Sequence, residues 1–225
     1  MTPRASGYLF LLGLACGLAI LPLTAYARLT PRWLRWLLIA AGSLVVGRYV
    51  ALAGLALAEE PSRVWGLHRL WFGSMVGLTL PAVFAVDALI RHPAMTPKKL
   101  LRRFSPFLAA YAALILAGGG DPVPDRVAGW AVSLSPGWRL FAAIVQGLFI
   151  AGFLTTCLLL ARKLPVPAIQ TALLVLTVAY LYLGVDGVIV AFGGWYDRPF
   201  LYSEMAASLA LWYAFQTAAS LQGGS

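Results

Sequence analysis

The chain has 225 residues, of which 61% are hydrophobic and only 11% are charged. Soluble domains have roughly a quarter of their residues charged, and a soluble protein of this size could not bury so much apolar surface, whereas a bilayer can. The net charge of +9 fits basic loops that face anionic lipid headgroups, so we expect no nucleic-acid partner. These properties predict an all-α, polytopic integral membrane protein that forms a single domain over residues 1–225.

Apolar stretches bounded by charged residues, prolines and glycines predict about seven membrane-spanning helices in one bundle, because a span needs about 20 residues. The predicted spans lie near residues 8–26, 36–58, 70–90, 104–119, 138–161, 166–192 and 200–221. The fourth span is short. We expect Gly184 and Gly187 to interrupt the sixth, and residues 127–137 to form an interfacial or re-entrant segment.

The charged residues of the predicted loops indicate an orientation, because loops rich in Lys and Arg remain in the cytoplasm. One side carries ten basic residues: Arg28, Arg32, Arg35, Arg91, Lys98, Lys99, Arg102, Arg103, Arg162 and Lys163. The other side carries six: Arg4, Arg63, Arg69, Arg126, Arg139 and Arg198. All loop acids lie on this second side, where they form an acidic outer mouth: Glu59, Glu60, Asp121, Asp125 and Asp197. We therefore predict a multi-pass protein of the cell (cytoplasmic or inner) membrane with its N-terminus outside and its C-terminus in the cytoplasm.

Four ionisable residues lie within the predicted spans, where a charged group costs about 3 kcal/mol unless it is paired or hydrated. They are Arg48, Asp87, Asp186 and Glu204, and each is a candidate for a solute, ion or proton site. At a rise of 1.5 Å per residue, Arg48 lies about 18 Å from the cytoplasmic face and Asp87 only about 5 Å from it. We therefore expect Arg48 to pair with Glu204 or Asp186, and Asp87 to lie at the lipid interface beside Arg91. The alternative is that Arg48, Asp186 and Glu204 line an outward-facing cavity.

Two Gly-x-x-x-Gly patterns predict close packing of helices, because small residues let helix backbones approach each other in lipid. The first consists of Gly13 and Gly17 in the first span, and the second of Gly73 and Gly77 in the third.

Motifs for catalysis, a cofactor or a metal are not recognisable in the sequence. We therefore expect no cofactor and no metal site, and we do not favour an enzyme, although an enzyme that acts on lipids stays an alternative.

The buried charges and the acidic mouth favour a transporter or channel for a small solute or ion that uses an outward-facing polar site. A non-catalytic membrane subunit or assembly scaffold and a seven-helix sensor module are the alternatives. If the buried charges are dry and paired, transport is disfavoured and the scaffold gains support. The expected partners are anionic lipid headgroups at the basic loop 91–103, and a second copy of the chain or another membrane protein.

Overall fold

The computed structural model describes residues 3–29, 31–60, 62, 65–93, 95–118, 120–125, 129–192 and 200–223. Within them are seven long helices: α1 (Pro3–Tyr26), α2 (Arg32–Leu57), α3 (Gly73–Ile90), α4 (Pro97–Ala117), α5 (Pro136–Lys163), α6 (Pro167–Ala191) and α7 (Leu201–Gly223). A 3-10 helix, η2 (Trp65–Phe72), leads into α3, and an antiparallel hairpin of β1 (Gly120–Asp125) and β2 (Gly129–Leu134) joins α4 to α5.

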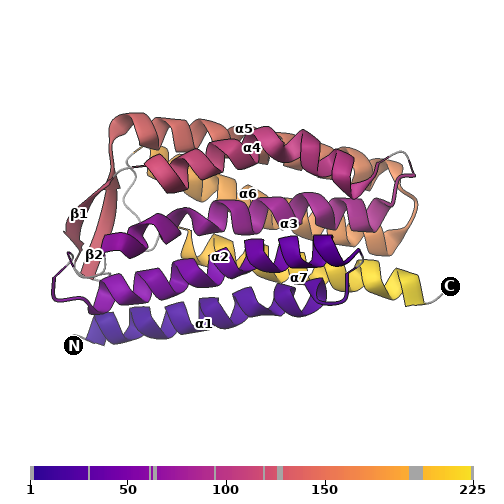
Figure 1. The fold of residues 1–225 in the computed structure, drawn as a ribbon. Coiled ribbons are helices and arrows are strands. Elements are labelled where there is room, and N and C mark those ends of the chain that lie inside the picture. The colour runs from indigo at the N-terminus through magenta and orange to yellow at the C-terminus, as the bar shows by residue number, and fades with distance from the viewer. Residues whose placement is uncertain are drawn as a thin grey trace.

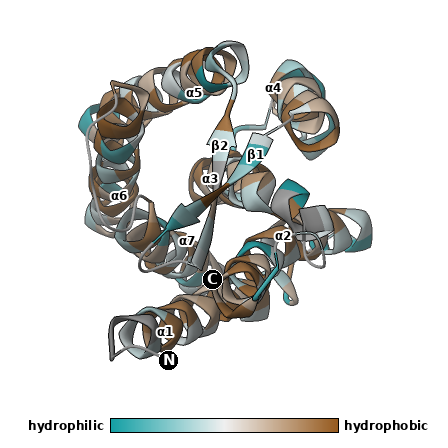
Figure 2. Cartoon of the chain, turned by 90° about the vertical axis from the view of Figure 1, so that its left-hand side faces the viewer, coloured by the Kyte–Doolittle hydropathy of each residue, from teal (hydrophilic) through white to brown (hydrophobic). Residues whose placement is uncertain are grey.

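The long helices lie side by side with alternating direction, so that α1 begins and α7 ends at opposite ends of the bundle (Figure 1). We call these the hairpin end, where β1 and β2 lie, and the C-terminal end. Each helix packs against the next one in sequence, and α7 packs against α1 and closes the ring. Helix α3 also packs against α7, and it lies near the middle of the view along the bundle (Figure 2).

Six of the described helices are long and apolar enough to cross a membrane, which supports an all-α membrane protein. Their outward surfaces carry large exposed apolar side chains, for example Leu148 on α5 and Val178 on α6, as a lipid-facing surface requires. Helix α7 has 23 residues but is not among these six. Most of its side chains are buried against α1, α3 and α6, so much of its surface can be polar without facing lipid.

Helix α4 begins before the predicted fourth span, which lies near residues 104–119. Helix α4 begins at Pro97, because Thr96 accepts a hydrogen bond from the backbone N–H of Lys99 and proline is favourable in the first turn. Most of the predicted basic loop 91–103 is therefore helical. The hydropathy pattern marks the limit of the apolar stretch, whereas the cap sets the beginning of the helix.

The structure bears on two other expectations about the backbone. Residues 129–134 form β2 of the hairpin, which lies across the end of the bundle and does not dip into it as a re-entrant segment would. The interfacial alternative stays a prediction, and residues 126–128 lie outside the described part of the chain. Helix α6 continues without interruption through Gly184 and Gly187. A Cβ atom at Gly184 would lie 3.1 Å from the Ile150 side chain, so this glycine permits a close contact between α6 and α5 instead of a break.

Only one of the two predicted glycine patterns makes a close helix contact among the described residues. A Cβ atom at Gly73 would lie 2.5 Å from the backbone oxygen of Leu44, and one at Gly77 would clash with Val45 and the backbone oxygen of Ala41. The pair therefore brings α3 against α2. The other pattern makes no close contact with the described residues, because a Cβ atom at either of its glycines, Gly13 and Gly17, would meet nothing within 4 Å. Packing of this pattern against a partner helix stays a prediction.

The hairpin lies across the hairpin end of the bundle and is attached to the end of α2 (Figure 2). The indole N–H of Trp130 donates a hydrogen bond to the carbonyl oxygen of Ala58, 3.1 Å away. Gly129 has a φ of +70°, and a Cβ atom there would lie 2.8 Å from the backbone oxygen of Leu55. Glycine is therefore needed here both for the backbone conformation and for the close approach to α2.

Candidate functional site

Three of the four predicted intramembrane charges meet in the half of the bundle nearer the hairpin end. Arg48 lies on α2, Asp186 on α6 and Glu204 in the first turn of α7, and their exposed fractions are only 4%, 1% and 2%. The position of Glu204 is favourable, because the N-terminus of a helix stabilises a negative charge. Phe200, which has a φ of +69°, precedes α7, and its carbonyl oxygen accepts a hydrogen bond from the backbone N–H of Glu204.

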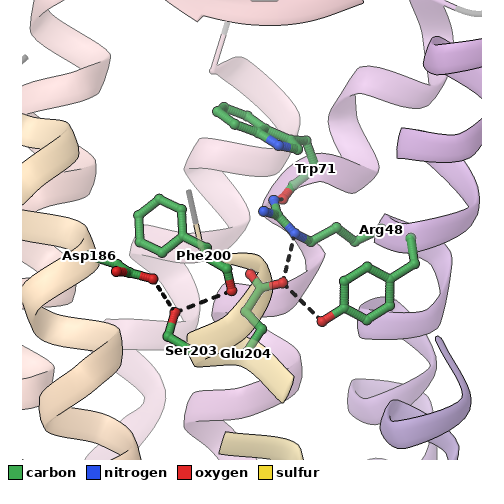
Figure 3. Close-up of polar contacts among 7 residues, drawn as sticks. Arg48, Trp71, Asp186, Phe200, Ser203 and Glu204 are labelled. Atoms are coloured by element: carbon green, nitrogen blue, oxygen red, sulfur yellow. Dashed lines mark hydrogen bonds and ion pairs between the residues drawn. The ribbon is translucent and has the colours of Figure 1, made fainter. Parts of the chain in front are cut away.

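An ion pair between Arg48 and Glu204 is the centre of this site (Figure 3). The Nε atom of Arg48 donates to Oε2 of Glu204 at 3.1 Å, and the hydroxyl group of Tyr49 donates to the same oxygen at 3.1 Å. Of the two partners expected for Arg48, the structure thus selects Glu204. The pair joins α2 to α7.

Trp71 of η2 completes the surroundings of the Arg48 guanidinium group (Figure 3). Its backbone carbonyl oxygen accepts a hydrogen bond from Nη1 of Arg48, and its ring centroid lies 5.4 Å from Cζ of Arg48. A carboxylate, a carbonyl oxygen and an aromatic ring therefore all stabilise this buried positive charge.

Among the described residues, the group that binds Asp186 is a hydroxyl group and not a cation. The Oγ atom of Ser203 donates to Oδ2 of Asp186 at 2.6 Å, and it also lies 3.2 Å from the carbonyl oxygen of Phe200. Since Ser203 and Glu204 are adjacent in sequence, the start of α7 positions both hydrogen-bonded groups. The site as described thus contains two carboxyl groups and one guanidinium group.

The site is almost closed to solvent, and Arg48 and Glu204 satisfy each other whereas Ser203 satisfies Asp186. Because all three charged side chains are almost fully excluded from solvent, they do not line an open, outward-facing cavity in this structure. Their arrangement can hold α2, η2, α6 and α7 together. It can also act as a gate that opens only when the ion pair separates.

The fourth charge, Asp87, lies near the opposite end of the bundle and does not join this site. It lines a cavity of about 560 Å³ at the C-terminal end, together with Arg28 and Arg91. The sequence indicated that Asp87 and Arg91 lie close to the same face, but no pattern in it indicated a cavity.

Those acidic residues of the predicted mouth that the structure describes lie at the hairpin end. Glu59, Glu60 and Asp121 are exposed, and Asp125 is partly buried. Asp197 lies outside the described residues.

Three contributors to the site were not predicted from the sequence: Tyr49, Trp71 and Ser203. Tyr49 and Ser203 directly adjoin a charged residue in the sequence, which is a signal that could have identified them. Trp71 contributes mainly through its backbone oxygen, and no sequence pattern reports such a contact.

Comparison with protein-family models, with curated proteins and with solved structures finds no match to this chain.

Proposed function

We propose that the chain is a transporter for a small solute or ion with seven spans, α7 included. In this proposal the structure represents a state that is closed at the hairpin end and open at the C-terminal end. The distribution of basic residues favours a cytoplasmic location for the C-terminal end and an outer location for the N-terminus. The observation that carries the proposal is the contrast between the two ends of the bundle.

Two layers support closure at the hairpin end. The outer layer is the hairpin, which lies across the bundle and is attached to α2 by Trp130. The inner layer, which we call the closed layer, lies deeper in the bundle. There the ion pair between Arg48 and Glu204 joins α2 to α7. Separating these groups requires water or a solute to replace their contacts, so the pair suits a gate that opens only on demand.

The cavity at the other end supports access from the C-terminal end. It lies partly against α7, where it is lined by Phe215 and Gln216. Glu204 and Gln216 are twelve residues apart on this helix, which corresponds to about 18 Å along its axis. Helix α7 therefore contributes both to the closed layer and to the open cavity. Carriers that work by alternating access need such a connection, since one end must close before the other opens.

A non-catalytic membrane subunit or scaffold is the second candidate, and two observations favour it. Arg48 and Glu204 are buried and paired with each other, as a purely structural role predicts. The surface around Gly13 and Gly17 on α1 is open, and small residues of this kind can accept a partner helix. The cavity at the C-terminal end has no explanation in this second proposal, which is why we rank it below transport.

Reconstitution into liposomes tests the first proposal. We expect uptake of at least one solute above that of empty vesicles in a panel of small organic anions, inorganic anions, cations and neutral metabolites. Replacing Glu204→Gln should lower this uptake at least tenfold or convert it to a leak, because the closed layer loses its charge pair. Absence of flux across the whole panel would overturn transport. Solute binding without flux would do the same and would favour a sensor module.

Thiol labelling gives a second test that distinguishes a gate from a scaffold. With both native cysteines replaced by alanine, Ser203→Cys places a thiol in the closed layer with little change in size. A transporter should expose this thiol to a membrane-impermeant reagent in one state, so that transported solute alters the labelling rate. A rigid scaffold should leave it unlabelled from either side. Ser220→Cys is the matched control, because Ser220 lies exposed on the same helix and should be labelled with or without solute.

A further inference from the structure

The cavity at the C-terminal end lies where the ends of α1 and α3, the start of α4 and the last third of α7 meet. Its volume of about 560 Å³ falls within the range of roughly 300–1,000 Å³ that is typical of small-molecule sites. The cavity is distinct from the buried ion pair, and none of its described lining residues contributes to the closed layer.

The deep part of the cavity is apolar. Phe84 of α3 and Phe215 of α7 both line it, and their exposed fractions are 2% and 3%. Ala88 and Ala218 add small apolar surfaces beside them. This floor can bury the hydrocarbon or aromatic part of a ligand. Because the floor side chains are already almost excluded from water, the favourable free energy of about 25 cal/mol per Å² comes mainly from the ligand's own apolar surface.

The rim of the cavity is basic. Arg28, which follows α1, and Arg91, which ends α3, are exposed and line it, and His92 lies beside them. Arg91 adopts a left-handed conformation with a φ of 49°, and its backbone N–H bonds to the carbonyl oxygen of Asp87. The backbone of Arg91 is thus fixed at the rim. Arginine binds carboxylate and phosphate groups well, because its planar fork of donors matches their geometry.

Helix α4 adds to the positive potential of the rim. Its capping residue, Thr96, and its first residue, Pro97, line the cavity, so the positive end of the helix dipole is close to it. Among the described residues that line the cavity, Asp87 is the one acid, and its negative charge opposes an anionic ligand.

We propose that this cavity binds an amphipathic organic anion. The apolar part of the ligand packs on Phe84 and Phe215, and its phosphate or carboxylate group is held by Arg28 and Arg91 at the rim. As the substrate class of the transporter this inference rests on the proposed function, but binding can be measured without transport. The same chemistry is offered by a soluble organic anion and by an anionic lipid.

Calorimetric titration with octyl phosphate tests the proposal on the full-length protein in nanodiscs of phosphatidylcholine, with empty nanodiscs as the blank. We expect saturable binding after the heat measured with empty nanodiscs is subtracted, and no saturable binding of octanol, which lacks the charged group. Absence of saturable binding of octyl phosphate, or equal binding of octanol, would overturn the proposal.

Variants identify the site. The double variant Arg28→Gln/Arg91→Gln should weaken binding about tenfold or more per arginine, and tenfold corresponds to about 1.4 kcal/mol. Asp87→Asn should strengthen binding several-fold, because it removes a like charge from the lining. Arg162→Gln is the matched control, since it removes an exposed charge at the same end of the bundle but outside the cavity. If the double variant binds as tightly as the wild type, the site is not this cavity and the inference fails.

Titration in nanodiscs that also contain phosphatidylglycerol distinguishes an anionic lipid from a soluble organic anion as the ligand. A higher apparent Kd for octyl phosphate would show that an anionic lipid competes for the cavity, whereas an unchanged Kd supports a soluble organic anion. Failure of binding with flux retained would remove this inference and leave the proposed transport intact. Binding without flux would support this inference and remove the proposed transport.

Discussion

At the scale of single residues, the contact between Arg48 and Glu204 dominates the interior of the protein. A charge in the apolar part of a membrane is costly, and removing one member of a buried pair leaves the other uncompensated. The hydroxyl group of Tyr49 and the backbone oxygen of Trp71 satisfy further hydrogen-bonding positions of the same pair. The pair should therefore behave as one energetic unit.

A double-mutant cycle tests this unit. Arg48→Met alone should lower the free energy of unfolding by about 3–5 kcal/mol, because Glu204 then stays buried without a cation. Adding Glu204→Gln should recover most of that loss, since glutamine still accepts a hydrogen bond from Tyr49 but carries no charge. Unfolding would be followed by circular dichroism in mixed micelles with increasing denaturing detergent. Additive losses in the double variant would contradict the coupling.

At the scale of elements, the contact of α3 with α2 depends on missing side chains. Gly73 and Gly77 lie directly against the α2 backbone, whereas the same spacing in α1, at Gly13 and Gly17, faces open space. Identical patterns thus have different consequences, because only one of them lies between two helices.

Alanine substitutions separate these two cases. Gly77→Ala should lower the free energy of unfolding by about 1–3 kcal/mol, because the added methyl group overlaps Val45 and the Ala41 backbone. Gly13→Ala is the matched control and should change it by less than about 1 kcal/mol in the stabilising direction, since alanine favours a helix. The same micellar unfolding measurement applies to both. Equal losses in the two variants would contradict a cost set by the contact with α2.

At the scale of the whole molecule, charge is distributed unequally between the two ends of the bundle. The ten basic residues assigned to one side all lie near the C-terminal end, and the described acids of the predicted mouth lie at the hairpin end. The fold brings these residues together because successive helices alternate in direction. The cavity with its basic rim opens at the end where the basic residues collect.

This arrangement predicts the accessibility of single cysteines in intact cells. In a chain without the native cysteines, Asp121→Cys at the hairpin end should react with a membrane-impermeant thiol reagent added outside. Arg162→Cys at the C-terminal end should react only after the membrane is permeabilised. Reaction of both positions from outside would contradict seven spans, and the reverse pattern would contradict the predicted orientation.

Much of the fold follows from the sequence, because lipid imposes a simple rule on the backbone. Each span must satisfy its own hydrogen bonds and present apolar residues, so the positions of α1, α2, α3, α5, α6 and α7 could be predicted within a few residues. Depth along each helix also limited the partners of Arg48 to Glu204 and Asp186. The beginning of α4 and the hairpin could not be predicted in this way, because capping and strand pairing do not follow hydropathy.

What the sequence alone determined was therefore the class of protein, the approximate spans and the set of charges that the membrane makes costly. The tertiary structure decided which of these charges meet. It selected Glu204 over Asp186 for Arg48, placed the Ser203 hydroxyl on Asp186, and separated Asp87 into a cavity at the other end. The physical reason is that depth in a membrane is set by position along one helix, whereas a contact depends on how each helix is rotated and which neighbours it has.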